Sequence, residues 1–417
     1  MNRTIRDLLL LFPRGGIKWL LRDEFSDTRA VGAVNGTPAT PGPGTRVVVD
    51  TDGDAVAVSG GAVTFANPNN NWTSHNVYYP AITRAAGIVL IMAHNGLPAA
   101  AANDMFMPGW GIDQVAIIAD GGHGALFIIS NLRAFEGNAS GVQVVAAYSI
   151  NTAYRLAFIL RSTGCYFLIR GGAFTTWTLL WVSAQHANTP LYPALINYGC
   201  TCSIDYIRVP VETWLPTPLC ADTYTRANGP IGASEVVGPD GQAVVSRAYT
   251  DQVGTWDISG NTAVATALGI VTLPALHADV VLRCTLTTPG AGVTPGGIVV
   301  RWLDANNYWY VRVTPGTAGN DVELVEVNAG VPTVRGAADK DPAAATAYTI
   351  AVITYGQTID VFWNNVREIH YITAALNETQ GIHGLRDEGN SNFVFDNLQV
   401  FPRGTGGEYA ALNTWSS

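Results

Sequence analysis

Charge is the scarcest property of this chain. Charged residues make up 13% of its 417 residues, and lysine occurs only at Lys18 and Lys340. Long surface helices are rich in Lys, Glu and Gln, so this composition disfavours a mainly helical fold. The formal net charge is -9 and the arginines are isolated, whereas nucleic-acid binders carry a basic stripe. We therefore expect no nucleic-acid partner.

Long hydrophobic runs are missing as well. A membrane span needs roughly 18 consecutive apolar residues, and no segment approaches that length. The run from Leu8 to Phe12 is too short for a signal-peptide core, and no small-residue cleavage site follows it. We expect residues 1–22 to form a short helical or extended arm that covers a sheet edge or docks on a partner. Its docking side chains would be Leu8, Leu9, Leu10, Leu11, Trp19, Leu20 and Leu21.

Cysteine is sparse and forms no metal-binding pattern. The five cysteines include no CxxC pair, and Cys200 and Cys202 would point to the same face of a strand. Buried thiols are expected, and a disulfide scaffold or a zinc site is not. The sequence also lacks HExxH, Gly-x-Ser-x-Gly and a phosphate-binding loop.

Turn and strand formers dominate what is present. The chain has 44 Gly and 22 Pro, together with many Thr, Asn, Ala and Val residues. Val56 and Val58 alternate with alanines, and Gly60-Gly61 separates them from Val63 and Phe65. This period-two pattern around a glycine turn is typical of a β-hairpin. We predict an all-β protein.

An internal repeat organises the chain. Residues 23–30 (DEFSDTRA) resemble 222–227 (DTYTRA), and residues 153–159 (AYRLAFI) match 347–353 (AYTIAVI) in the same order. Such matches predict a tandem duplication, joined where Pro216 and Pro218 disfavour both helix and central strand. The predicted parts are the arm at 1–22, a domain at 23–212, a linker at 213–219, a domain at 220–403 and a flexible or docking tail at 404–417. Domains of this size favour a two-sheet jelly roll over the roughly 100-residue immunoglobulin class.

Segments of the second domain resemble a known superfamily. Residues 296–302 and 306–311 are similar to the central strand pair of the concanavalin A-like/laminin-G-like jelly rolls, and residues 395–400 resemble their closing strand. The resemblance implies two tandem concanavalin A-like jelly-roll β-sandwich domains. Members include sugar-binding modules, glycosidases, adhesins and viral structural domains, so the resemblance alone does not choose a function.

Two aromatic groups are candidate sugar-binding residues, because pyranose rings stack on Trp and Tyr side chains. The first group lies in or beside the Asn-rich segment 67–71 and comprises Trp72, Tyr78 and Tyr79. Anchoring of that loop is its competing interpretation. The second group comprises Trp302, Tyr308 and Trp309. Core packing is the competing interpretation for this second group.

Clustered acids suggest two further sites. Asp50, Asp52 and Asp54 offer oxygens that suit calcium, although an Asp-Gly step is also common in hairpin turns. Calcium is therefore the one candidate cofactor, and no other is predicted. The residues Asp321, Glu323 and Glu326 come nearest to a glycosidase triplet, but their order is reversed relative to that of the superfamily's glycosidases. We accordingly predict that the chain is not an enzyme.

Three function classes compete. Low charge, duplicated jelly rolls and apolar or flexible ends favour a structural or surface protein of a bacteriophage virion, such as a decoration, fibre or baseplate component. Its partners would be other virion proteins and copies of itself, and its location would be the virion. The alternative is an extracellular or cell-surface carbohydrate-binding protein or adhesin that contacts cell-surface glycan. A glycosidase is the least favoured class.

Overall fold

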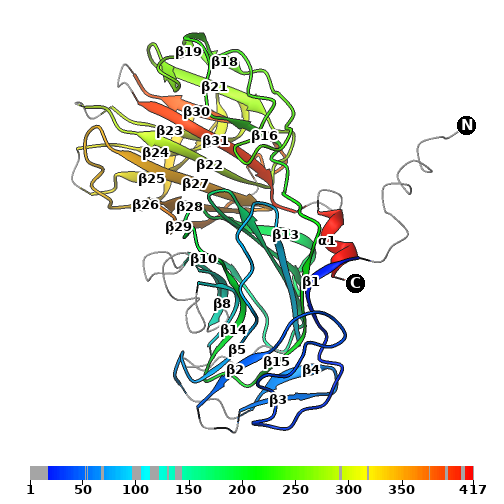
Figure 1. The fold of residues 1–417 in the computed structure, drawn as a ribbon. Coiled ribbons are helices and arrows are strands. Elements are labelled where there is room, and N and C mark those ends of the chain that lie inside the picture. The colour runs from blue at the N-terminus through cyan, green and yellow to red at the C-terminus, as the bar shows by residue number, and fades with distance from the viewer. Residues whose placement is uncertain are drawn as a thin grey trace, which may run out of the picture.

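Almost all of the regular secondary structure in the described part of this protein is β-strand (Figure 1). The computed structural model describes residues 17–51, 53, 55–66, 70–95, 105–112, 122–128, 131–136, 143–290, 294–316, 319–374, 376–389, 393–404 and 409–416. Within these ranges the strands gather into four antiparallel sheets, and one short helix, α1 (Ala410–Trp415), lies near the C-terminus. The predicted all-β fold class, with sheets arranged as β-sandwich domains, is confirmed.

The first two sheets contain the strands between Trp19 and Pro210. The 8-stranded sheet holds, in order, β13 (Phe174–Val182), β12 (Gly164–Gly171), β11 (Tyr154–Arg161), β6 (Val89–Asn95), β15 (Cys202–Pro210), β4 (Ala62–Phe65) and β3 (Val56–Ser59), and β1 (Trp19–Asp23) also pairs with β15. The 7-stranded sheet holds β10 (Gln143–Ala147), β9 (Asn131–Phe135), β8 (His123–Ile128), β7 (Met105–Gly111), β14 (Tyr192–Tyr198), β5 (His75–Tyr78) and β2 (Val47–Asp50). We call this pair of sheets the first sandwich.

The other two sheets contain the strands between Cys220 and Pro402. The 9-stranded sheet holds β17 (Gly229–Pro230), β19 (Trp256–Ile258), β20 (Ala263–Ala265), β31 (Val394–Pro402), β22 (Val280–Thr287), β27 (Ala347–Tyr355), β28 (Thr358–Trp363) and β29 (Val366–Ile372), and β16 (Cys220–Asp222) also pairs with β31. The 7-stranded sheet holds β18 (Thr250–Val253), β21 (Gly269–Pro274), β30 (Ile382–Asp387), β23 (Gly296–Asp304), β24 (Asn307–Val313), β25 (Val322–Asn328) and β26 (Val331–Ala338). This pair is the second sandwich.

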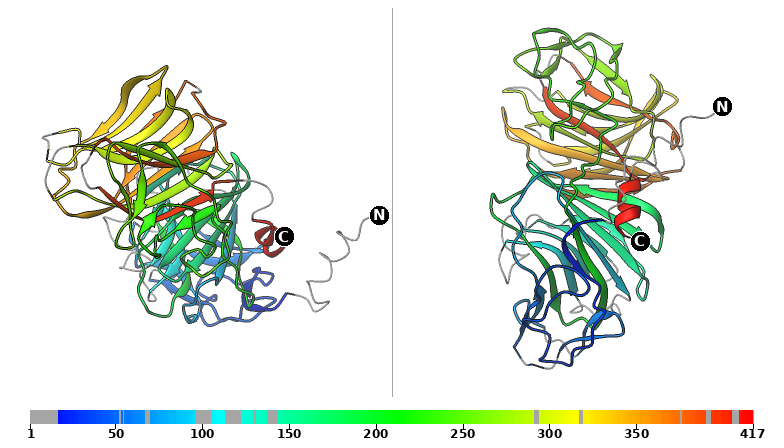
Figure 2. Two further views of the ribbon diagram at one scale, coloured as in Figure 1. Left: turned by 90° about the horizontal axis from the view of Figure 1, so that it is seen from above. Right: turned by 45° about the vertical axis from the view of Figure 1, so that its right-hand side comes forward.

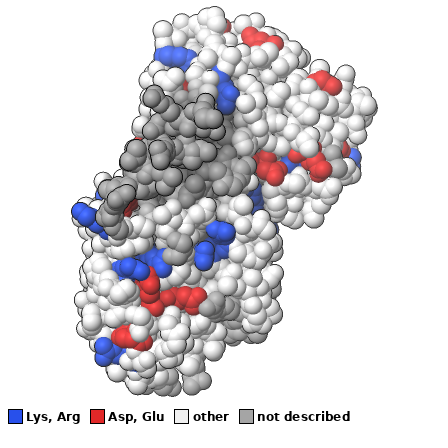
Figure 3. All heavy atoms as spheres, turned by 90° about the vertical axis from the view of Figure 1, so that its right-hand side faces the viewer, with Lys and Arg blue, Asp and Glu red and all other residues white. Residues whose placement is uncertain are grey.

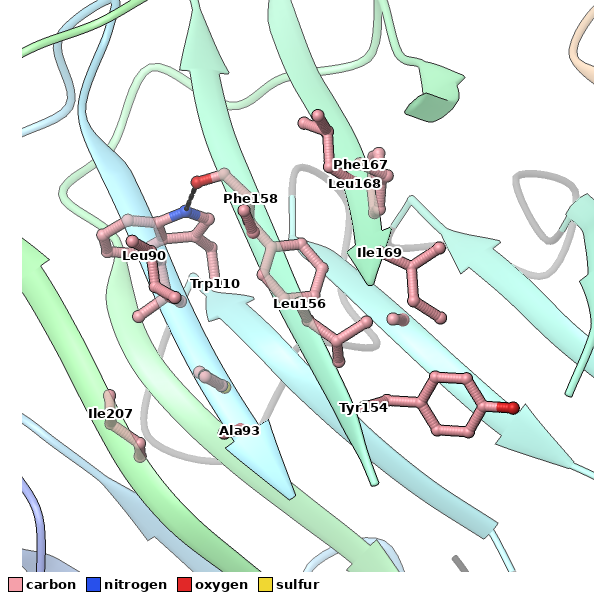
Figure 4. Packing of buried hydrophobic residues seen from close by; sticks show 14 of the residues in the cluster. Leu90, Ala93, Trp110, Tyr154, Leu156, Phe158, Phe167, Leu168, Ile169 and Ile207 are labelled. Carbon is pink, nitrogen blue, oxygen red and sulfur yellow. Dashed lines mark hydrogen bonds between the residues drawn. The ribbon is translucent and has the colours of Figure 1, made fainter. Parts of the chain in front are cut away.

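Alternating apolar side chains from both sheets fill the first core (Figure 4). Trp110 on β7 is fully buried, and its indole Nε1 donates a hydrogen bond to the carbonyl oxygen of Phe158 on β11 at 3.3 Å. Leu90 on β6 and Leu156 on β11 belong to the same cluster. Large aromatic side chains bury the most apolar area per residue, so Trp110 links the two sheets both by packing and by a polar contact.

The repeated acidic motif has the same structure in both sandwiches. Asp23 ends β1, which pairs with β15, and Asp222 ends β16, which pairs with β31. The Asp23 carboxylate accepts a hydrogen bond from the N–H of Phe25 at 3.0 Å, and the Asp222 carboxylate accepts one from Tyr224 at 2.8 Å. Phe25 and Tyr224 both adopt a positive φ, of 49° and 53°. The sequence match therefore corresponds to one buried turn used twice.

The two sandwiches are packed against each other (Figure 2). A buried ion pair joins Arg161 of the first to Asp240 of the second, with Nε and Oδ2 2.9 Å apart. The rings of Trp181 and Phe362 meet across the same interface with centroids 4.7 Å apart. The first core continues into the second sandwich at Phe401. Relative motion of the sandwiches would therefore disrupt both apolar packing and a buried ion pair.

The C-terminal segment docks on this chain's own first sandwich. Leu412 and Trp415 of α1 are buried in the first core. The hydroxyl of Tyr206 donates a hydrogen bond to the carbonyl of Ser416, and Arg208 donates one to that of Trp415, both at 3.0 Å. Of the two alternatives predicted for the tail, flexible or docking, these contacts agree with docking for residues 409–416, here on the chain's own first sandwich. The predicted domain boundaries themselves stay predictions.

The N-terminal arm is only partly described. Leu8, Leu9, Leu10 and Leu11 lie outside the described residues. Residues Trp19–Asp23 form β1, a strand of the first sandwich, so the predicted arm at 1–22 overlaps that sandwich. Leu21 is 2% exposed within the first core, which corrects its assignment to partner docking, whereas Leu20 is 43% exposed and Trp19 is half-buried.

The surface carries few charges. On the face drawn in Figure 3, acidic and basic side chains are scattered among uncharged ones. No helix among the described residues has the length and apolar character needed to cross a membrane.

Candidate functional site

Strand alternation divides the predicted aromatic candidates between two faces. Tyr78 packs on the outer face of the first 7-stranded sheet, while Tyr79 is 1% exposed in the first core and donates a hydrogen bond to Asp23 at 2.8 Å. Tyr308 likewise faces outward on β24, whereas the adjacent Trp309 is fully buried in the second core. Successive strand residues point to opposite faces, so neither pair can act as one binding surface. Tyr79 and Trp309 are therefore corrected to core residues.

The outer aromatic cluster of the second sandwich is closed. Trp302, Tyr308 and Tyr310 are only 3%, 4% and 2% exposed. The rings of Trp302 and Tyr308 lie 4.7 Å apart, and the guanidinium of Arg386 stands 4.4 Å from the Tyr310 ring centroid. Arg386 also donates a hydrogen bond to the Tyr308 hydroxyl. Because these rings cover one another, little of Trp302 or Tyr308 is left exposed for a ligand to contact. Their low exposure does not support the predicted ligand-binding role.

The outer face of the first 7-stranded sheet is open by comparison. Trp72 and Tyr198 are half-buried, and their ring centroids lie 4.9 Å apart at an interplanar angle of 39°. The half-buried Tyr192 lies on the same face, at the other end of β14. We call Trp72, Tyr192 and Tyr198 the aromatic face. It rests on an apolar cluster that includes Tyr78 and Ile196.

Two asparagines position Trp72. The side-chain oxygen of Asn71 accepts hydrogen bonds from the backbone N–H of Thr73 at 3.1 Å and from its hydroxyl at 2.9 Å. This Asx-type bonding is why the chain turns at residues 72–74, just before β5. The side-chain amide of Asn76 on β5 then donates a hydrogen bond to the Trp72 carbonyl at 2.9 Å. These bonds fix the backbone around Trp72.

The aromatic face combines ring surfaces with hydrogen-bonding groups. Burial, together with the nearby Tyr192, raises the pKa of Tyr78, so its hydroxyl stays protonated near neutral pH. Arg133 on β9 is half-buried in the same sheet, three strands from β14. Among the described residues its Nε atom has no hydrogen-bond partner. Such a surface suits a flat ligand with one apolar face and polar edges.

Sequence reasoning found Trp72 and Tyr78 but missed Tyr192 and Tyr198. Period-two spacing places both tyrosines on one face of β14 together with Ile196. Leu195 on the opposite face is also apolar and belongs to the core. Since both faces of β14 are apolar, the sequence pattern does not show which face is open.

Of the three aspartates predicted to bind calcium, the structure describes Asp50, and backbone N–H groups bind its carboxylate. Asp50 accepts hydrogen bonds from the N–H groups of Gly53, Ala55 and Val56 at 3.1–3.2 Å. These bonds support the turn interpretation of the segment. Asp52 and Asp54 lie outside the described residues.

The acids around β25 have separate partners. Glu323 pairs with Arg312 and Glu326 with Arg335, each at 2.5 Å. Asp321 accepts hydrogen bonds from the backbone N–H groups of Lys340 and Asp341. Its carboxylate also lies within 4.8 Å of those of Asp339 and Asp341, but clustered acids of this kind are common without an ion.

Comparisons with known proteins show only distant likeness. No protein-family model and no curated protein matches the chain. The carbohydrate-binding module CBM66 from Bacillus subtilis is 18% identical, with 37% of this chain and 94% of that one covered and a TM-score of 0.32. The galectin LEC-6 from Caenorhabditis elegans is 12% identical, with coverages of 31% and 89% and a TM-score of 0.26. The GH43 protein BlXynB from Bacillus licheniformis is 10% identical, with coverages of 86% and 97% and a TM-score of 0.30.

One prediction is wrong in the light of these matches. We predicted that the chain is not an enzyme, yet the structures aligned with 86% of it are of a GH43 protein. The prediction that the chain is not an enzyme therefore no longer holds. At this identity and TM-score the likeness transfers no activity and no active-site residue to the chain.

Proposed function

We propose that this protein binds carbohydrate through the aromatic face of its first sandwich. The observation that carries the proposal is the half-buried pair of Trp72 and Tyr198, whose ring centroids lie 4.9 Å apart beside a hydrogen-bonded turn on this sheet face. Fixed aromatic rings lose little conformational entropy when a ligand binds. The proposal adopts the alternative function predicted from the sequence.

The chemistry of sugars fits this surface. The C–H groups on one side of a pyranose can pack on the indole of Trp72, while hydroxyl groups at the ring edge need polar partners. Asn71 and Thr73 are exposed beside Trp72 and can supply such polar partners. An open face of this kind favours modest affinity, because much of the ligand stays in water.

The virion interpretation has less to support it. Its docking residues Leu8 to Leu11 lie outside the described part of the chain, and Leu21 is buried in the chain's own core. The predicted virion partners, self-association and location stay predictions.

A glycan array tests the proposal. The full-length protein should bind a restricted set of glycans, and Trp72→Ala should lose that signal while keeping its circular dichroism spectrum. The matched control is Tyr371→Ala, since Tyr371 is a half-buried aromatic residue of the second sandwich. Equal array signals from the wild type and Trp72→Ala would refute the assignment of the site.

A further inference from the structure

A pocket opens where the two sandwiches meet, away from the aromatic face. It encloses about 420 Å³, within the range of small-molecule sites. The first sandwich lines it with Ala147 of β10, Ala173 of the turn after β12 and Phe174 of β13. The second sandwich contributes Tyr355 at the end of β27 and Arg403 after β31. Neither sandwich forms this pocket alone.

Arg403 is the unusual group in this pocket. It is 3% exposed, and its guanidinium carbon stands 3.7 Å from the ring centroid of Tyr355. Among the described residues its Nη1 atom has no hydrogen-bond partner, and no carboxylate forms an ion pair with it. Burial lowers the pKa of Arg403, so the charged guanidinium stands where an additional anion would stabilise it.

The backbone fixes this arginine in place. The Arg403 N–H donates a hydrogen bond to the carbonyl of Asp279 at 3.0 Å, and its carbonyl accepts one from Leu179 on β13 at 2.6 Å. The second of these bonds crosses between the sandwiches. The cation is therefore held at the interface before any ligand arrives, which lowers the entropic cost of binding.

The neighbouring carboxylate does not neutralise Arg403. Asp279 also lines the pocket, but its Oδ1 accepts hydrogen bonds from Arg301 at 3.2 Å and from the N–H of Gly356 at 2.9 Å. The charges of both Asp279 and Asp360 act on Arg403, although neither carboxylate forms an ion pair with it in the described part of the chain. A cation with these two carboxylates nearby favours a ligand with a single negative charge. A doubly charged phosphate would be repelled by Asp279.

We propose that this pocket binds a carboxylate-bearing sugar of monosaccharide size, such as a uronic acid. The planar guanidinium of Arg403 matches a carboxylate in shape and charge. Phe174 and Tyr355 supply ring surfaces, and Thr176 and Thr178 supply hydroxyl groups for the sugar edge. The inference goes beyond the proposed function, because this site shares no residue with the aromatic face.

Calorimetric titration of the full-length protein with D-glucuronate, D-glucose and inorganic phosphate tests the inference. Glucuronate should bind saturably at millimolar concentration or below, and glucose should bind at least about tenfold more weakly because it lacks the charge. Failure of glucuronate to bind, or equal binding of glucose or phosphate, would overturn the inference.

Variants then locate the binding. Arg403→Gln removes the charge, and Ala173→Trp fills the pocket from an exposed turn position without touching Arg403. Both should weaken glucuronate binding at least about tenfold. Ala344→Trp is the matched control, because Ala344 is exposed in the loop at the opposite end of β27 from Tyr355. Trp72→Ala should leave glucuronate binding unchanged, so failure of this inference and failure of the proposed function can be told apart. Glucuronate binding that is unaffected by Ala173→Trp would overturn the inference even if Arg403→Gln fails to fold.

Discussion

Asp23 holds together several parts of the first sandwich. Its carboxylate pairs with Arg46 at 2.6 Å, and both side chains are fully buried. It also accepts hydrogen bonds from the Tyr79 hydroxyl and from the backbone N–H of Phe25. Arg46 also pairs with Asp27 at 2.8 Å, so loss of Asp23 would leave the buried charge of Arg46 only partly compensated.

Replacement of this carboxylate should therefore be severe. We predict that Asp23→Ala lowers the free energy of unfolding by about 3–5 kcal/mol, the range found when one member of a buried ion pair is removed. Urea denaturation followed by tryptophan fluorescence measures the change. Asp251→Ala, at an exposed aspartate, is the control and should be nearly neutral. Similar midpoints for the two variants would contradict the role given to Asp23.

At the residue scale the sequence indicated which side chains matter better than where they point. The repeated acidic motif was visible, and the structure gives it the same turn in both halves. Which face of the sheet Tyr78 and Tyr79 each point to, by contrast, depends on the register of β5 against β14 and β2. A shift of one residue would exchange their faces, and local sequence does not specify that register.

At the scale of elements, the C-terminal helix shows where pattern alone is insufficient. Composition around Gly404, Gly406 and Gly407 predicted a flexible or docking tail and did not choose between the two. Leu412 and Trp415 of α1 are buried against the first sandwich. The partners of such a short helix lie far away in the chain, so its docking is not encoded in a local periodicity.

We predict that loss of this apolar contact loosens the tail. Leu412→Ala should lower the stability of the first sandwich by about 2–4 kcal/mol, as for other buried leucines, and should expose the C-terminal segment to proteases. Thermal unfolding and limited proteolysis are the measurements. Leu276→Ala is the matched control, since Leu276 is 65% exposed. A Leu412 variant as stable and as protease-resistant as the control would show that the helix does not contribute.

At the scale of the whole molecule, the interface between the sandwiches contains a buried acid. Glu136 follows β9, is fully buried and accepts a hydrogen bond from the indole of Trp181 at 2.5 Å. Burial raises the pKa of Glu136 from 4.5 to about 7, and the hydrogen bonds with Ser183 and Trp181 and the charge of the nearby Arg283 offset only part of that rise. Trp181 in turn contacts Phe362 of the second sandwich.

The raised pKa makes stability depend on pH. The folded protein holds the Glu136 proton more tightly than the unfolded chain, so the stabilisation is complete below pH 4.5 and is lost as pH rises through about 7. We predict that the wild type loses up to about 3 kcal/mol relative to Glu136→Gln between about pH 5 and pH 8, since one pKa unit corresponds to about 1.4 kcal/mol. Urea denaturation of both proteins at the two pH values measures this difference. The same pH dependence in both proteins would rule out Glu136 as its source.

Carbohydrate binding at Trp72 can be measured by calorimetric titration of the full-length protein with a glycan selected by the array. We expect saturable binding that is weakened about tenfold to a hundredfold in Trp72→Ala, because a central aromatic contact is lost, and that is unchanged in Tyr371→Ala. An affinity in Trp72→Ala equal to that of the wild type, or the absence of any glycan that binds, would contradict this expectation.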